Sequence, residues 1–238
     1  MSSTVGQIEK QTQARVVTLL RDRLHYTYLG PWLDRADNAN IESERLSAWL
    51  ASQGIAPALA SRAIFELKKV AGDTSQTLYE RNREVYRLLR YGVKLKPEVG
   101  ENTVTVWLVD WQLVDANDFA FAEEVTVKGA DAKAATKRPD IVLYINGIAV
   151  GVLELKRSTV SVSEGIQPFF STMQWVMAGN DTEGLRYGTI ETPEKYYLKW
   201  VEEGGEFAAE PNALDRHLLQ VCSKARLLEL IHDCVVVD

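Results

Sequence analysis

The feature that most constrains this chain is a pair of apolar runs joined by Asn146-Gly147. The runs cover residues 141–145 and 148–155 and read I-V-L-Y-I and I-A-V-G-V-L-E-L. Asn-Gly favours the two-residue turn of a β-hairpin, in which both turn residues adopt positive φ. Because apolar residues occupy consecutive positions, both faces of the hairpin need cover. The sequence therefore predicts a hairpin inside a sheet that is covered on two faces.

The flanking segments complete this prediction. Apolar residues follow helical spacing before residue 92 and strand-like spacing after it. We expect an N-terminal helical part, 1–92, and a part with the core sheet and C-terminal helices, 93–238, integrated into one domain. The expected helices cover residues 5–24, 40–50, 57–70, 76–91 and 214–232. The other expected strands cover residues 93–99, 103–109, 119–127, 187–190 and 196–200. Asn40 is a good N-cap for the second helix. The predicted fold class is α/β, with a mixed central sheet flanked by helices.

Composition bounds the function classes. Hydrophobic residues make up 46% of the 238 residues, enough for a sizeable core. No apolar run approaches the length of a membrane helix, and the N-terminus lacks the pattern of a signal peptide. Cys222 and Cys234 are too few for a disulfide framework. We therefore expect a cytoplasmic protein with no membrane partner.

Charge gives a mixed indication of nucleic-acid binding. The net charge of −6 argues against a dedicated binding module, but residues 81–96 hold six basic side chains and one acidic one. Four of the basic residues would share one face if the helix ran far enough: Arg83, Arg87, Arg90 and Lys94. They could contact DNA phosphates, as could Arg138, or form a solvated surface with ion pairs such as Glu84 with Arg87.

The residues that carry chemistry lie at one end of the hairpin. Glu154 and Lys156 are two apart on a strand and point to the same face, and Asp140 precedes the first strand. A charge among apolar residues is costly without a partner. A metal site supplies one, because Mg²⁺ binds one or two carboxylates together with water and phosphate. Asp140 and Glu154 would be its ligands, and Lys156 would lie beside the attacking water. An exposed ion pair at a hairpin end is the alternative.

Register decides whether the two carboxylates can meet. With a strict two-residue turn, Ile145 pairs with Ile148, so Pro139 lies opposite Glu154 and Asp140 points to the other face. We therefore predict a three-residue turn, or a bulge near Asp140.

Two other readings of the sequence remain open. His217, Cys222, His232 and Cys234 are possible zinc ligands, although their spacing matches no familiar site. Four tryptophans could stack on bases or fill the core: Trp107, Trp111, Trp175 and Trp200.

P-D followed by E-L-K resembles the motif of the PD-(D/E)xK nuclease superfamily. The longer stretch R-P-D-I-V-L-Y-I-N-G-I-A-V-G-V-L-E-L-K resembles the N-terminal nuclease domain of the R (motor-nuclease) subunits of type I restriction enzymes. So do L-L-R-Y-G-V-K upstream and A-G-N-D-T-E-G-L-R-Y-G-T-I-E-T-P-E-K-Y-Y-L-K-W downstream. The resemblance covers nearly the whole chain.

This resemblance implies an endonuclease that cuts double-stranded DNA within a type I restriction-modification complex. Asp140 and Glu154 would bind Mg²⁺, or Mn²⁺ in its place, and Lys156 would be catalytic. Modification and specificity subunits would be the partners. The chain has no G-x-x-x-x-G-K-[ST] loop, so the ATP-dependent motor of the family is expected outside it, in C-terminal motor domains of the subunit. A non-catalytic domain that docks DNA or subunits is the alternative.

Two further site residues follow from the resemblance. Superfamily members often carry another acid on the first core helix, for which Glu42 is the candidate by position, with Glu44 next. Gln167 is the candidate for the family's active-site glutamine. The family usually has a longer segment between the lysine and this position, whereas here Gly165 runs almost directly into Gln167.

Overall fold

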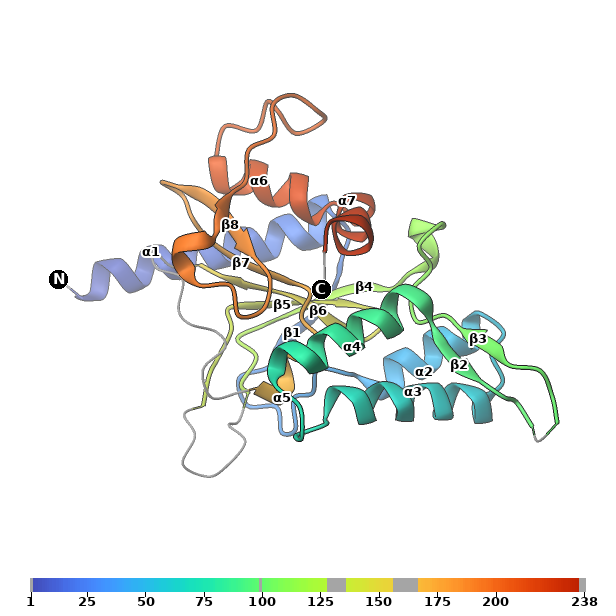
Figure 1. Ribbon diagram of the computed structural model, residues 1–238. Coiled ribbons are helices and arrows are strands. Elements are labelled where there is room, and N and C mark those ends of the chain that lie inside the picture. The colour runs from blue at the N-terminus through green and yellow to red at the C-terminus, as the bar shows by residue number, and fades with distance from the viewer. Residues whose placement is uncertain (1, 99, 128–135, 156–166, 236–238) are drawn as a thin grey trace.

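The structure is a computed structural model that describes residues 2–98, 100–127, 136–155 and 167–235 (Figure 1). Seven strands form one mixed sheet in the order β1-β4-β5-β6-β7-β8-β9. Their bounds are β1 Thr27–Pro31, β4 Phe119–Glu123, β5 Ile141–Ile145, β6 Ile148–Glu154, β7 Trp175–Asn180, β8 Gly184–Gly188 and β9 Leu198–Lys199. β1 with β4 and β6 with β7 are parallel pairs, and the other neighbours are antiparallel. A separate hairpin joins β2, Val93–Leu95, to β3, Val104–Val106. The predicted mixed sheet is confirmed.

Helices lie on both sides of this sheet. Figure 1 shows α1, α6 and α7 on one side, with α2, α3, α4 and α5 on the other. The α-helices are α1 Ser2–Thr18, α2 Ser43–Ser52, α3 Pro57–Ala71, α4 Leu78–Tyr91, α5 Gln167–Phe170, α6 Ala213–Cys222 and α7 Lys224–Glu229. Short helical turns are η1 Leu19–Arg23, η2 Val114–Ala116, η3 Glu194–Tyr196 and η4 Leu230–Cys234. No helix among the described residues is long and apolar enough to cross a membrane.

The central hairpin is buried as its sequence predicts. Every residue of β5 and β6 is buried, and the two strands lie in the middle of the sheet. Side chains alternate between two apolar clusters: Ile141 and Leu143 belong to the one that includes residues of α1–α4, α6 and α7, and Val142 and Tyr144 to the one that includes α5. Because both faces of β5 and β6 are covered, their sequences do not alternate between apolar and polar residues.

Several predicted elements need correction. Asn40 is not an N-cap, because α2 begins at Ser43 after Glu42 and the Asn40 carbonyl instead accepts a hydrogen bond from Ala149. β1 lies where we expected only a break between helices, and β7 was not predicted. The next strand, β8, covers 184–188, whereas the expected range was 187–190. β1 is parallel to its partner β4, which is distant in sequence, so no local turn signal marks it. β7 forms a hairpin with β8 through the short turn 181–183, which the sequence analysis missed.

α6 is attached to β8 through His217. Its Nδ1 accepts a hydrogen bond from the Leu185 backbone N–H at 3.1 Å. Burial lowers the pKa of His217 from its usual 6.5, and the positive charges of Arg216 and Lys199 act in the same direction. The neutral imidazole is therefore the form that the fold favours.

This shift predicts a pH-dependent stability. Below about pH 6.5 the unfolded chain binds a proton that the folded chain resists, so the free energy of unfolding falls as the pH falls. In His217→Gln, we expect the free energy of unfolding to depend less steeply on pH below about pH 6.5, by at most about 1.4 kcal/mol per pH unit. Urea unfolding at a series of pH values measures both slopes. If the difference in free energy of unfolding between variant and parent is the same at every pH, then His217 is not the source of the pH dependence.

Candidate functional site

A β-bulge in β6 sets the register of the hairpin. Ile145 pairs with Ile148, so the turn is a strict two-residue turn, and Asn146 and Gly147 have φ of 54° and 82°. The predicted three-residue turn is wrong. Beyond the turn, Tyr144 pairs with Ala149 but Leu143 pairs with Gly151, which leaves Val150 as the extra residue. The bulge that we expected near Asp140 therefore exists, but it lies closer to the turn.

The bulge brings Asp140 and Glu154 to one face of the hairpin. After it, Val142 pairs with Val152 and Ile141 with Leu153, and continuing this register by one residue beyond β5 would set Asp140 opposite Glu154. Both would then lie on the face of Val142 and Val152, which belongs to the apolar cluster of α5. Without the extra residue in β6, the alternation would have put the two carboxylates on opposite faces.

Backbone hydrogen bonds position Asp140. Its Oδ2 accepts a hydrogen bond of 2.7 Å from the N–H of Leu155, the residue after Glu154. Its own carbonyl accepts one of 2.9 Å from the N–H of Glu124, which follows β4 and has a φ of 50°. The carboxylate of Asp140 is thus tied to the strand that carries Glu154. Sequence reasoning missed both donors, because backbone amides leave no signature in residue type.

Glu154 is a buried carboxylate, with a relative exposure of 7%. It ends β6, where the neighbouring residue in the parallel strand β7 is Ala178. A carboxylate in such surroundings is stabilised by a nearby cation or by hydrogen-bond donors. Lys156, the expected catalytic lysine, and the segment up to residue 166 lie outside the described residues. Gln167 begins α5, but its side chain is likewise outside the description.

The structure does not bring Glu42 to this pair. Glu42 precedes α2, and its N–H donates to the Gly147 carbonyl at the turn of the hairpin. The seven residues of β6 separate that turn from Glu154, which at about 3.3 Å each is roughly 20 Å. Both carboxylate oxygens of Glu42 are bonded to Arg35, at 2.9 and 2.7 Å. The Glu42 carboxylate is paired at the opposite end of the hairpin.

Only three of the four basic residues of the predicted face lie on α4: Arg83, Arg87 and Arg90. The helix ends at Tyr91, and Gly92 with φ 71° turns the chain, so Lys94 lies in β2. Glu84 forms ion pairs with Arg83 and Arg87, at 3.5 and 2.8 Å, as in the surface alternative. Arg90 donates to the Tyr86 hydroxyl. Arg138 is exposed two residues before Asp140, which keeps it available to a phosphate near the hairpin end.

The possible zinc ligands do not converge. His217 Nδ1 accepts the Leu185 N–H, and Cys222 is buried, which raises the pKa of its thiol to about 12. Cys234 is exposed, and His232 contacts Asp233. Within the described part of the chain, no group of three or more His, Cys, Asp or Glu side chains could hold a metal ion.

Two of the four tryptophans pack against one tyrosine. Trp175 stacks on Tyr187 with ring centroids 4.9 Å apart, and Trp200 meets the same ring edge-on at 5.6 Å. Trp111 donates from its indole nitrogen to the Leu89 carbonyl. These three rings serve packing, whereas Trp107 keeps 50% of its surface exposed.

Comparison with known proteins identifies the family. Residues 6–195 match the family described as type I restriction enzyme R protein N terminus. The chain is also 36% identical over 189 residues to the "Putative type I restriction enzyme MjaIXP endonuclease subunit" of Methanocaldococcus jannaschii, an alignment that covers 66% of this chain. The aligned region spans 18% of that relative's length. The matched region includes the whole hairpin and both carboxylates, and the chain belongs to the family of type I restriction enzyme R protein N termini.

Proposed function

We propose that this chain is a divalent-metal-dependent endonuclease domain that cleaves DNA as part of a type I restriction-modification complex. The observation that carries the proposal is the bulged register, whose continuation past the pair Ile141–Leu153 would set Asp140 opposite Glu154 at the end of a buried hairpin. Like charges that face one another repel, and burial penalises the charge of Glu154, so two acids at this place favour a cation between them. The family supports a nuclease role, and the relative's name is that of an endonuclease subunit.

The two carboxylates fit a magnesium ion. Mg²⁺ takes oxygen ligands, usually one or two carboxylates with water and substrate phosphate. Asp140 uses Oδ2 to accept the Leu155 N–H, and among the described residues no hydrogen bond reaches its Oδ1. Oδ1 therefore keeps its lone pairs for a cation. Bound Mg²⁺ supplies Lewis-acid activation of water and of the scissile phosphate, with Mn²⁺ able to replace it.

The chain's own residues would prepare this chemistry. The Leu155 N–H holds Asp140 in one orientation, and the rigid sheet fixes Glu154 beside it. Lys156 would share their face by strand alternation, where its ammonium group would orient the attacking water or stabilise charge on the phosphate. Arg138 and Gln167 are the nearest candidates along the chain for contacts to DNA. Modification and specificity subunits would supply sequence recognition, and the ATP-dependent motor would act from other domains of the R subunit.

Calorimetric titration of Mn²⁺ and Mg²⁺ tests the site directly. We expect the chain to bind the metal, and Asp140→Ala and Glu154→Ala each to abolish binding with the circular dichroism spectrum unchanged. Glu42→Ala is the matched control, because its carboxylate is paired with Arg35 at the far end of the hairpin and its loss should leave metal affinity intact.

Each other outcome has a definite meaning. Metal binding that survives both substitutions would show that these carboxylates are not the ligands. Loss of binding in Glu42→Ala would move the site to the turn. If the chain binds neither metal, alone or with added duplex DNA, the non-catalytic docking domain becomes the better description.

A further inference from the structure

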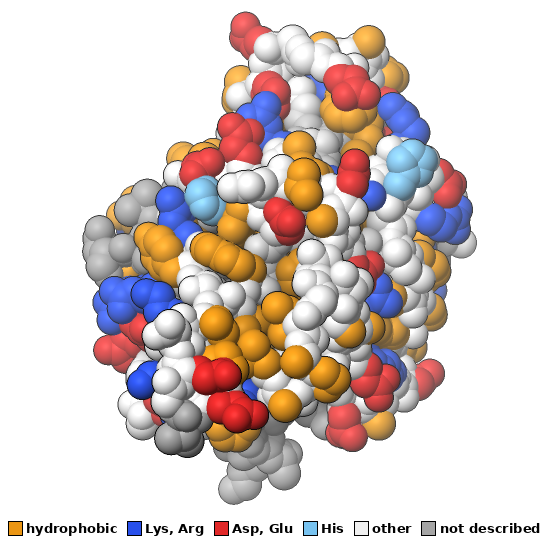
Figure 2. Space-filling view, turned by 90° about the vertical axis from the view of Figure 1, so that its right-hand side faces the viewer, with side chains coloured by type: hydrophobic (Ala, Val, Ile, Leu, Met, Phe, Trp, Pro, Cys, Tyr) orange, Lys and Arg blue, Asp and Glu red, His pale blue; other side chains and the backbone are white. Residues whose placement is uncertain are grey.

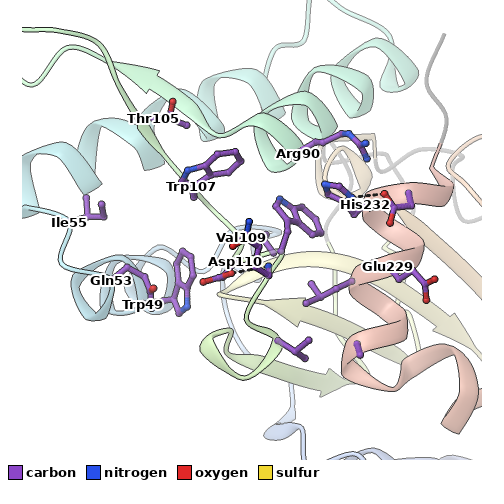
Figure 3. A pocket seen from close by; sticks show the side chains of 16 residues that line it. Trp49, Gln53, Ile55, Arg90, Thr105, Trp107, Val109, Asp110, Glu229 and His232 are labelled. Carbon is purple, nitrogen blue, oxygen red and sulfur yellow. Dashed lines mark hydrogen bonds and ion pairs between the residues drawn. The ribbon is translucent and has the colours of Figure 1, made fainter.

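A second site lies at the opposite end of the hairpin from Asp140 and Glu154. It is a cavity of about 820 Å³ between α2, the chain after β3, the end of α4, and the α7–η4 segment (Figure 3). Trp49 lines it and donates from Nε1 to the Ala116 carbonyl, and the next residue, Asn117, accepts a hydrogen bond from Asn146 in the hairpin turn. Its volume is within the range of sites that hold a small molecule or anchor side chains of a partner.

Three tryptophans line this cavity. They are Trp49, Trp107 and Trp111, and Figure 3 shows Trp107 above Trp49, with His232 and Glu229 of the α7–η4 segment to their right. Trp111 is held by its hydrogen bond to Leu89 and by contact with the His232 ring, at 4.9 Å between centroids. The half-exposed ring of Trp107 has no such constraint within the described residues. The free edge of this ring therefore offers an aromatic surface at the wall of the cavity to a partner side chain.

The charge around the cavity is negative. Asp110, Glu229 and Asp233 line it, against a single guanidinium, Arg90. Arg226 pairs with Glu229 and with Glu202 and so offsets part of the charge of Glu229, which leaves Asp110 and Asp233 as the main negative charges of the lining. Figure 2 shows the same side of the molecule, where acidic side chains are scattered around hydrophobic ones.

Aromatic faces beside carboxylates suit a cation. Arginine and lysine side chains bind over indole rings through cation–π attraction, and the carboxylates add a Coulombic term. The phosphates of a nucleic acid would meet repulsion from the same acids. A neutral apolar segment would gain from the rings but nothing from the carboxylates.

We propose that this cavity is a docking site for a separate protein that presents a basic segment, with an arginine side chain seated against Trp107. Tryptophan and arginine are the side chains that most often dominate protein interfaces, because they combine a large apolar area with a polar group. The proposal does not depend on the nuclease site, which lies at the other end of the hairpin. Metal binding and peptide binding should therefore be lost independently of one another.

The test uses a fluorescein-labelled peptide, Gly-Arg-Leu-Arg-Leu-Gly, titrated with the 238-residue chain at low salt. A matched peptide with citrulline in place of both arginines keeps the shape and removes the charge. We expect saturable binding that is about tenfold tighter for the arginine peptide. Trp107→Ala should weaken it by about tenfold. Glu229→Gln should weaken it by about threefold and should flatten its dependence on salt.

Two control variants separate the cavity from general surface effects. Phe65→Ala removes another exposed aromatic ring, on α3 outside the cavity, and should leave the affinity unchanged. Glu9→Gln removes an exposed carboxylate on α1 and should do the same. No saturable binding up to about 1 mM protein would overturn the proposal. Equal affinity for the two peptides would also overturn it, as would binding unaffected by Trp107→Ala. Binding of labelled oligothymidine that Trp107→Ala abolishes would reassign the cavity to nucleic acid.

Discussion

Glu154→Gln is expected to lower DNA cleavage by at least about a hundredfold, because it removes a charge from the proposed metal site while keeping the size of the side chain. Glu154 is buried at the end of a rigid strand. In the variant, a surface carboxylate therefore cannot take its place as a metal ligand. Initial rates of plasmid nicking with Mg²⁺ measure the effect, with the chain alone and within a reconstituted restriction complex. Free energies of unfolding of parent and variant, measured in parallel, separate chemistry from stability.

The neighbouring strand supplies the control for this substitution. Glu123 ends β4 and pairs in register with Ile141, so it points to the opposite face from Asp140. Its carboxylate accepts hydrogen bonds from Gln13 and Tyr28 of the N-terminal segment. We expect Glu123→Gln to retain cleavage. Full cleavage by Glu154→Gln, or an equal loss in both variants, would remove Glu154 from the site.

The sequence predicts the hairpin well because its information is local. Asn146 and Gly147 adopt the positive φ values that their residue types favour, and the unbroken apolar runs require cover on both faces. The facing carboxylates could be predicted only conditionally. One hairpin register places Asp140 and Glu154 on the same face, and the other places them on opposite faces. The sequence of residues 141–155 does not indicate a bulge at Val150. That outcome depends on β7, since the Val150 carbonyl accepts a hydrogen bond from Gln174, just before β7.

The failed predictions depend on contacts between distant segments. The sequence indicates Glu42, by position, as the further acid on the first core helix, but helical spacing does not say which end of the hairpin that helix approaches. In the structure α2 meets the turn through the Glu42–Gly147 hydrogen bond. Likewise the spacing of Arg83, Arg87 and Arg90 is helical, but the positive φ of Gly92 ends the helix before Lys94. The cavity beside Trp107 also required the fold, because its walls come from four separated segments.

Gly147→Ala should be the most destabilising single-methyl change in the hairpin. Gly147 has φ 82°, and a Cβ there would lie 2.8 Å from the Glu42 carbonyl oxygen, 2.9 Å from the Arg45 Cβ and 3.0 Å from the Leu46 nitrogen. Two of these three atoms are backbone atoms of α2 and its N-cap, so the helix must move or the turn must deform. We expect a loss of at least about 3 kcal/mol in the free energy of unfolding, from left-handed strain together with overpacking.

Gly54→Ala separates the two causes. Gly54 has nearly the same φ, 77°, but a Cβ there would meet nothing within 4 Å. It should therefore cost only the strain of the left-handed conformation, about 1 kcal/mol. Urea unfolding of the two variants beside the parent gives both values. Equal losses would mean that α2 does not press on the turn as closely as the structure shows. A larger loss at Gly147 would show that the close packing of α2 on the turn stabilises the hairpin that carries Asp140 and Glu154 at its other end.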